Sequence, residues 1–161
     1  MSELVKYLEN ENLNNVTTYI QSGNIIFQTS NKNTFDLERT IRGVINQHFN
    51  IDVPNFVISL ADLKSVIDNN PFLDDKSLDP QFFHVSFLSQ SVTNIDKTQF
   101  EIKKNENEQF YFHDNVFYLY CPDGYGKTKL TNNFIESKLK ITSTTRNWKT
   151  VNELLKIGLN R

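Results

Sequence analysis

The sequence predicts an α+β protein, in which antiparallel strands and helices follow one another without the strict alternation of a parallel α/β fold. Two observations lead to this prediction. Two pairs of β-rich runs are each joined by a short turn, which is typical of antiparallel hairpins. Over several other segments, apolar residues recur three or four positions apart, and this spacing is typical of helices that bury one face.

Residues 1–59 predict a ferredoxin-like subdomain that lacks its first strand. Apolar residues at helical spacing predict helices over 2–12 and 33–49, and the β-rich runs within 16–29 predict a hairpin. Residues 53–58 predict one further strand. The order helix, strand, strand, helix, strand is that of a β-α-β-β-α-β unit without its first strand. Such a sheet has an unpaired edge, and we expect this edge to favour a homodimer through strand pairing.

Residues 60–161 predict a second α+β subdomain that contains an antiparallel hairpin and ends in two helices. Aromatic and β-branched runs predict its strands, and apolar residues at helical spacing predict its helices. The expected elements are a helix over 60–68, a strand over 82–88, a short helix over 95–100, a hairpin over 110–120 and helices over 130–139 and 148–159.

Composition is typical of a globular protein from a reducing compartment. Charged residues make up 22% of the chain, and no apolar run is long enough to span a membrane. Cys121 is the single cysteine, so it has no partner for an internal disulfide, and the first residues include no apolar stretch of signal-peptide length. We therefore expect a cytoplasmic protein without a membrane partner, with Cys121 as a small buried residue rather than a nucleophile.

Charge is distributed unevenly along the chain, although the net charge is only −2. Residues 127–161 contain eight basic and two acidic residues, which leaves +6 in this segment and −8 in residues 1–126. This asymmetry predicts either an anionic partner or mutual attraction between two parts of the same chain. Both interpretations remain open at this point.

A glycine-containing segment between a predicted strand and a predicted helix is the strongest candidate for a binding site. Glycines there would let backbone N–H groups face outward beside basic side chains, an arrangement that binds anions. The predicted ligand residues in this segment are Gly124, Gly126, Lys127, Thr128 and Lys129. The alternative is that the glycines only form a turn and the lysines are solvated.

This segment differs from a nucleotide-binding P-loop. Cys121 occupies the position at which a P-loop requires glycine, and Pro122 lacks an N–H donor. The preceding strand belongs to a predicted hairpin rather than to a parallel sheet. The sequence therefore does not predict an NTP-hydrolysing site.

Arg146 and Asn147, which precede the last predicted helix, complete the predicted ligand site. Together with Trp148 they offer a guanidinium, an amide and an aromatic face, a set that recognises phosphates or bases. Alternatively, Asn147 caps the helix, and Trp148 belongs to the core because it shares a helical face with Val151. For Arg146 the sequence indicates no such structural role.

No cofactor and no metal site is predicted, and no catalytic residue is identified. The three histidines, His48, His84 and His113, show no metal-ligand spacing, and they form no local nucleophile arrangement with Cys121. Glu136 is the nearest carboxylate in sequence to follow the glycine segment, and it would be the acid or base of an enzyme.

Four segments together resemble the bacterial domain-of-unknown-function family 1697. They are Val16–Phe27, Asn70–Phe72, Pro122–Asn132 and Thr144–Trp148, and they occur in the order of the family. The resemblance implies a ferredoxin-like first half, a second α+β half and no settled biochemical role. Family members usually begin with a strand and a glycine-rich segment, which this chain lacks. Either the true start lies upstream, or the chain is a shortened member.

Three functions remain open after the sequence analysis. We favour a binding protein for an anionic small molecule, phosphate-like or nucleotide-like, at the glycine segment. The first alternative is a nucleic-acid-binding module that uses the basic segment 127–161. The second alternative is an enzyme that acts on a phosphorylated substrate.

Overall fold

The computed structural model describes residues 2–20 and 23–161, so the predicted turn residues Gln21 and Ser22 lie outside the described part. Helices and antiparallel strands are both present, which confirms the α+β class. Among the described helices, none is both long enough and apolar enough to cross a membrane.

The chain divides into two compact units. Met1–Asp62 and Leu154–Arg161 form the first unit, and Leu63–Glu153 forms the second. Leu154–Arg161 thus groups with the first unit, although the predicted boundaries assigned these residues to the second.

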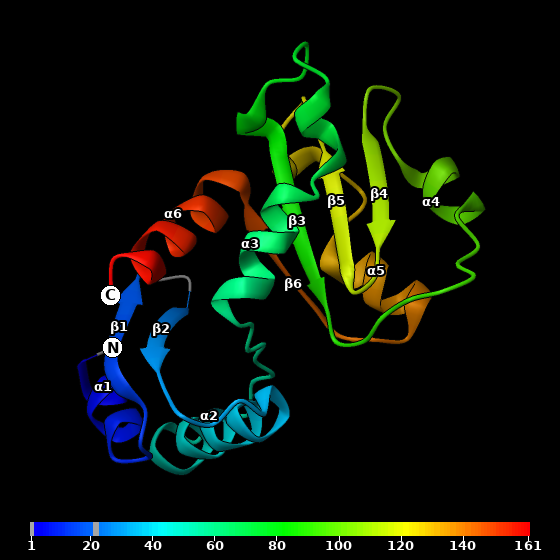
Figure 1. The fold of residues 1–161 in the computed structure, drawn as a ribbon. Coiled ribbons are helices and arrows are strands. Elements are labelled where there is room, and N and C mark those ends of the chain that lie inside the picture. The colour runs from blue at the N-terminus through cyan, green and yellow to red at the C-terminus, as the bar shows by residue number, and fades with distance from the viewer. Residues whose placement is uncertain (1, 21–22) are drawn as a thin grey trace. The chain divides into compact units, whose positions relative to one another are not determined.

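The first unit packs two helices against a two-stranded antiparallel sheet (Figure 1). Its elements are α1 (Ser2–Glu9), β1 (Asn14–Tyr19), β2 (Asn24–Gln28) and α2 (Thr34–Phe49). The predicted hairpin and both helices are therefore present. Leu8, Val16 and Ile41 are among the residues that form the core between them. The Asn33 side chain accepts the Asp36 N–H at 3.2 Å and caps α2.

Residues 53–58 do not form a strand, and this prediction is wrong. The Asn55 amide donates to the Glu38 carbonyl at 3.0 Å, and the Val57 N–H donates to the Glu38 carboxylate at 2.9 Å. The segment is therefore held by α2 instead of a neighbouring strand. In a β-α-β-β-α-β unit the last strand pairs with the first. In the described part of the first unit only β1 and β2 pair, so the ferredoxin-like sheet is not confirmed.

The second unit contains a four-stranded antiparallel sheet in the order β4-β5-β3-β6. Its strands are β3 (Phe83–Leu88), β4 (Gln109–His113), β5 (Val116–Tyr120) and β6 (Ser143–Asn147). The β4–β5 hairpin was predicted from the sequence. Strand β6 was not, because its residues are polar and show no apolar pattern. It forms because β3 provides an edge along five residue pairs, from His84–Asn147 to Leu88–Ser143.

Helices and short 3₁₀ turns complete the second unit. They are α3 (Leu60–Asp68), η1 (Pro71–Asp74), η2 (Pro80–Phe82), α4 (Thr98–Lys103), η3 (Tyr125–Lys127), α5 (Asn132–Leu139) and α6 (Trp148–Leu159). The unit boundaries fall within α3 and α6, so the first three residues of α3 and the part of α6 from Leu154 onward group with the first unit. The helix predicted over 95–100 begins later, at Thr98. Asp96 accepts the Thr98 N–H at 3.0 Å and so forms a turn just before this start.

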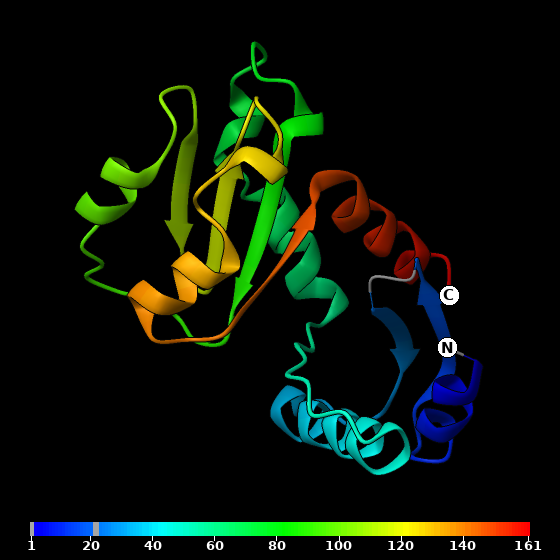
Figure 2. The same ribbon diagram turned by 180° about the vertical axis from the view of Figure 1, so that it is seen from behind.

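Side chains of the four-stranded sheet alternate between two faces, which we name the α3 face and the α5 face. On the α3 face, shown toward the viewer in Figure 1, the Tyr118 hydroxyl donates to the Val66 carbonyl at 2.7 Å. On the α5 face, shown in Figure 2, Phe117 belongs to a core cluster with Phe100 of α4 and Ile135 of α5. Apolar side chains cover the middle of both faces, so this sheet is a structural core.

Replacing Tyr118 with Phe should flatten the loss of stability at alkaline pH. Burial, with a smaller effect of the Asp114 carboxylate, raises the pKa of Tyr118 to about 12. Above about pH 10 the unfolded tyrosine ionises first, so folding stability falls by about 1.4 kcal/mol per pH unit. Tyr118→Phe should remove the contribution of this residue to the slope and leave the one that the buried Cys121 thiol makes. The lost hydrogen bond should cost about 1 kcal/mol at neutral pH.

Urea unfolding between about pH 8 and about pH 11.5 measures this slope. The matched control is Tyr111→Phe on β4, because the Tyr111 side chain is 56% exposed. The control should keep the slope of the natural protein. Equal slopes in both variants would contradict the assignment.

Candidate functional site

The glycine turn, residues 121–129, connects β5 to the segment before α5. Gly124 has φ 96° and ψ 150°, a backbone conformation that side-chain-bearing residues rarely adopt. The Gly124 N–H donates to the Cys121 carbonyl at 3.0 Å, and the Lys127 N–H donates to the Gly124 carbonyl at 3.1 Å. Gly124 therefore sets the path of the turn. Gly126 carries no such requirement, and an added Cβ there would meet nothing within 4 Å.

Three contacts hold the glycine turn in place. The Tyr125 ring stacks on the His84 ring of β3, with 4.7 Å between centroids and 22° between planes. The Asn105 amide donates to the Lys127 carbonyl at 3.2 Å. Thr128, which is buried, accepts the N–H of Leu130 at 3.1 Å. Thr128 therefore stabilises the turn and offers little surface to a ligand.

The outer side of the turn presents positive charge and backbone donors. Lys127 and Lys129 are exposed, and neither has a carboxylate partner in the described residues. Within the same part of the chain, the Tyr125 and Gly126 N–H groups have no hydrogen-bond acceptor. Ammonium groups beside outward N–H donors form an arrangement that attracts and orients an anion. The exposed Asp123 carboxylate opposes this attraction.

The structure does not bring Arg146 to the glycine turn. In the β3–β6 ladder Arg146 pairs with Val85, whereas its neighbour Asn147 pairs with His84. His84 contacts Tyr125 of the turn on the α5 face, so alternation directs Arg146 to the α3 face. The Arg146 guanidinium donates to the Thr144 hydroxyl at 2.8 Å, and burial lowers its pKa. Arg146 therefore does not belong to a site at the turn.

Asn147 has a structural role at the start of α6. Its side-chain oxygen accepts the Thr150 N–H at 2.8 Å, which is the capping interaction that the alternative interpretation predicted. The amide oxygen is thereby engaged within the protein. Among the predicted ligand residues, Gly126, Lys127 and Lys129 are exposed at the glycine turn.

Cys121 and His84 form a pair beneath the turn that the sequence did not indicate. The Cys121 Sγ lies 3.4 Å from the His84 Nδ1, although 37 residues separate the two in the chain. Pairing of β3 with β5 brings them together, since Phe83 lies opposite Tyr120. A contact of this kind has no signal in a single sequence.

The Cys121–His84 pair is neutral rather than ionised. Burial, followed by the nearby Glu108 and Asp123 carboxylates, raises the pKa of Cys121 to about 12. Burial also lowers the pKa of His84, and the Phe82 carbonyl only partly opposes this shift. A thiol nucleophile requires the thiolate, which this environment disfavours. Cys121 is fully buried, as the sequence predicted.

Glu136, the carboxylate proposed for an enzyme, is engaged in holding β6. Its Oε1 accepts the Ser143 N–H at 2.8 Å. Nearby, the Asn132 side-chain oxygen accepts from the hydroxyls of Ser143 at 3.0 Å and Thr145 at 2.6 Å. These contacts give the start of α5 a structural role. The described residues also contain no group of three or more His, Cys, Asp or Glu that could hold a metal ion.

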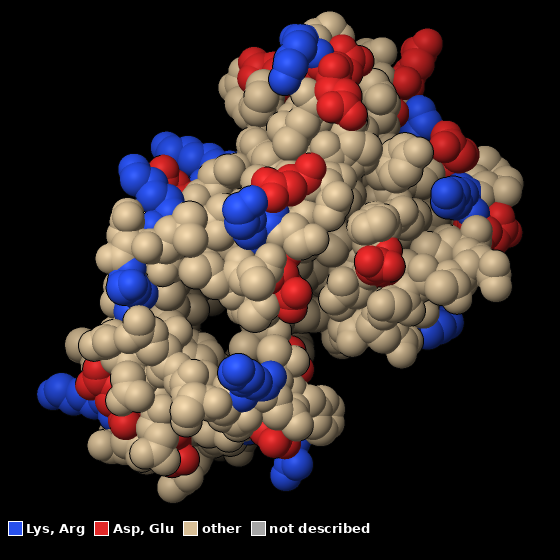
Figure 3. Space-filling view, in the orientation of Figure 1, with Lys and Arg blue, Asp and Glu red and all other residues tan. Residues whose placement is uncertain are grey.

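The basic residues of segment 127–161 are divided between the two units. Arg161 belongs to the first unit, where its guanidinium donates to the Asn15 carbonyl of β1. Arg146 is half-buried in β6, whereas Lys127 and Lys129 are exposed. On the side of the molecule drawn in Figure 3, basic and acidic side chains are interspersed.

The fold and the glycine turn define an α+β protein with a small turn that carries two exposed lysines. The chain belongs to the family described as protein of unknown function (DUF1697), whose model matches residues 1–118. This match confirms the family resemblance seen in the sequence. The matched residues end before the glycine turn.

A similar solved structure is that of a conserved bacterial protein from Streptococcus pneumoniae. The two chains share 24% sequence identity with a TM-score of 0.65, and the match covers 97% of this chain and 87% of the other. At this identity the similarity shows the fold alone. No curated protein matches the sequence. The comparisons therefore indicate no specific function.

Replacing Gly124 with Ala should destabilise the protein, whereas the same change at Gly126 should not. A Cβ at φ 96° costs about 1–2 kcal/mol, because left-handed backbone is strained for L-residues. At Gly126 the added methyl group enters open space, and the free energy of unfolding should stay unchanged or rise by up to about 1 kcal/mol. Urea unfolding of both variants measures the difference. Equal effects at the two glycines would contradict this account of the turn.

The Cys121 thiol should resist labelling in the native protein. With a pKa of about 12, roughly one thiol in ten thousand is ionised at about pH 8. A thiol reagent such as DTNB should therefore react very slowly with native Cys121 and quickly after unfolding in urea. Rapid, complete labelling of the folded protein would show that the thiol is accessible and activated.

Proposed function

We propose that the protein binds a small anionic ligand, phosphate-like or nucleotide-like, at the outer side of the glycine turn. The observation that carries this proposal is the pair of exposed ammonium groups, Lys127 and Lys129, without carboxylate partners in the described residues. They flank a turn in which the Tyr125 and Gly126 N–H groups lack an intramolecular acceptor. Charge and directional donors thus occur together.

The fixed conformation of the turn supports this function. A turn already held by the Tyr125–His84 stack and by Asn105 loses little conformational entropy when a ligand binds. Gly126 is exposed and has no side chain to hinder the approach of an anion to its N–H. The nearby Asp123 carboxylate should limit the affinity, because like charges repel.

The enzyme and nucleic-acid alternatives receive less support. Glu136 is engaged by the Ser143 N–H, and the Cys121–His84 pair is buried and neutral, so neither supplies an obvious acid, base or nucleophile at the turn. A nucleic-acid module would require a broader basic surface than two adjacent lysines.

We also propose a cytoplasmic location. The single thiol, Cys121, is buried and unpaired, which suits a reducing compartment where proteins do not depend on disulfides for stability. We propose no membrane partner, because the exposed lysines that support anion binding lie in one local turn.

Replacing both lysines of the turn should weaken anion binding. Calorimetric titration with inorganic phosphate, pyrophosphate and AMP identifies the anion that binds best. Lys127→Ala and Lys129→Ala should each weaken the binding of this anion by about tenfold, because each variant loses one charge-assisted contact. Lys149→Ala is the matched control, because Lys149 is an exposed lysine of α6 outside the turn. It should bind the anion as the natural protein does.

Two outcomes would reject the anion-binding proposal. One is an absence of saturable binding by all three anions at low ionic strength. The other is equal weakening by the Lys149 control, which would indicate a general charge effect. Tighter binding of a single-stranded oligonucleotide with a steep salt dependence would instead support the nucleic-acid alternative.

We propose in addition that two copies of the chain associate through the outer edge of β2. The edge of β1 is occupied by Arg161, which donates to the Asn15 carbonyl. Strand β2 contains no charged residue, so a two-fold pairing of β2 with its copy would place no like charges opposite each other. Ile26→Lys should therefore shift sedimentation toward the monomer. Thr17→Lys, at the position of β1 that pairs with Ile26, should not. A natural protein that stays monomeric at high concentration would refute this association.

A further inference from the structure

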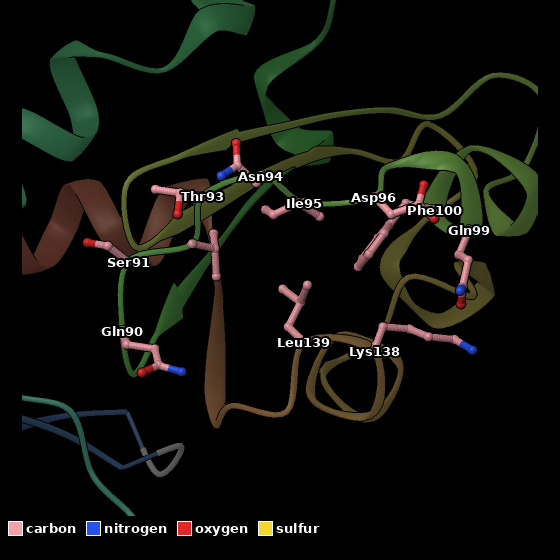
Figure 4. A pocket seen from close by; sticks show the side chains of 11 residues that line it. Gln90, Ser91, Thr93, Asn94, Ile95, Asp96, Gln99, Phe100, Lys138 and Leu139 are labelled. Carbon is pink, nitrogen blue, oxygen red and sulfur yellow. The ribbon is translucent and has the colours of Figure 1, made fainter.

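A hollow of about 450 Å³ opens on the α5 face of the second unit, between the segment after β3, α4 and α5 (Figure 4). The glycine turn contacts His84 at the beginning of β3, whereas the hollow is formed by residues that follow Leu88 at the end of the same strand. The two places therefore lie at opposite ends of β3. The volume of the hollow falls within the range of about 300–1,000 Å³ that small-molecule sites occupy.

The floor of the hollow is apolar and firmly packed. Ile95, Phe100 and Leu139 point into its centre from three sides in Figure 4. Phe100 is a core residue, and Val92, Ile95 and Leu139 pack against the same core cluster. Because these side chains belong to the core, the floor keeps its shape when a ligand binds.

The rim of the hollow is polar and uncommitted. It carries the exposed side chains of Gln90, Ser91, Thr93, Asn94 and Gln99. Within residues 23–161 none of these five side chains has a hydrogen-bond partner. Amide side chains both donate and accept hydrogen bonds, and hydroxyl groups do so as well. The rim therefore matches a ligand with several hydroxyl groups.

Backbone hydrogen bonds hold this rim before any ligand arrives. The Val92 N–H donates to the Asp114 carbonyl at 3.1 Å, and the Ser89 N–H donates to the Thr142 carbonyl at 2.9 Å. The Ser89 hydroxyl in turn accepts the Thr142 N–H at 3.1 Å. The segment between β3 and α4 is thus tied to the β4–β5 turn and to the residue before β6. Such pre-organisation lowers the entropic cost of binding.

The charges at the hollow are balanced. Asp96 and Lys138 both line it, one from the start of α4 and one from α5. Hydrogen bonds from Thr98 lower the pKa of Asp96, so this carboxylate stays ionised and acts as a hydrogen-bond acceptor. An anionic ligand would meet Asp96 and a cationic ligand would meet Lys138. The Lys138 ammonium lies 5.7 Å from the centroid of the Phe134 ring, and in Figure 4 it points away from the centre of the hollow. A neutral ligand can therefore use Asp96 as a hydrogen-bond acceptor without meeting a second charge.

We propose that this hollow binds a neutral polyhydroxylated ligand of the monosaccharide class. The C–H face of a sugar ring fits the floor made by Ile95, Phe100 and Leu139. Its hydroxyl groups fit the amide and hydroxyl side chains of the rim and the Asp96 carboxylate. The site is separate from the anion site at the glycine turn and does not depend on it.

Amide-detected NMR titration of the whole chain with glucose, galactose, mannose and N-acetylglucosamine tests the proposal. At least one sugar should cause saturable shifts at residues 90–99 and 138–139, while the amides of the glycine turn stay unchanged. Gln99→Ala should weaken this binding by about fivefold, the effect of one lost hydrogen bond. Gln109→Ala, at an exposed glutamine of β4 outside the hollow, is the matched control and should bind as the natural protein does.

Absence of saturable shifts at residues 90–99 with all four sugars would overturn the proposal, and so would equal weakening by Gln99→Ala and Gln109→Ala. A titration with glucose 6-phosphate keeps the two sites distinguishable. Shifts confined to residues 124–129 would support the anion site and count against the hollow. Shifts at residues 90–99 that match those of glucose would support the sugar site.

Discussion

Antiparallel pairing along both edges of β3 is the interaction on which the rest of the second unit depends. This strand pairs with β5 on one side and with β6 on the other, each over five residues. Because side chains alternate along a strand, the register decides which residues reach each face. It places His84 under the glycine turn and directs Arg146 to the opposite face. A shift of β6 by one residue along β3 would place Arg146 on the α5 face instead.

The two proposed sites lie at the two ends of β3, and they share one physical basis. At one end, the buried and neutral Cys121–His84 pair gives the glycine turn a rigid base while Lys127 and Lys129 remain in solvent. At the other end, Phe100 and its neighbours form a fixed floor below an uncommitted polar rim. In both places core packing holds the backbone, and polar groups that folding does not use face outward. Such groups are the ones available to a ligand.

Several features of the fold could be predicted from the sequence because each depends on residues close together in the chain. The β4–β5 hairpin and the cap of α6 by Asn147 belong to this group, the latter as the alternative to a ligand role. The glycine turn does as well, since Gly124 alone adopts the left-handed conformation within residues 121–129. For the candidate site, the sequence thus located the turn and its two lysines but not the support beneath them.

The sequence by itself determined the α+β class, the family, the helices and the position of the glycine turn, because short-range periodicity and backbone preference suffice for these. Only the tertiary structure decided that residues 53–58 lie along α2, that Ser143–Asn147 becomes a strand, and that Arg146 is separated from the turn. The physical reason is that a strand exists only with a hydrogen-bonding neighbour. That neighbour is supplied by residues far away in the chain, and their register then sets the direction of every side chain.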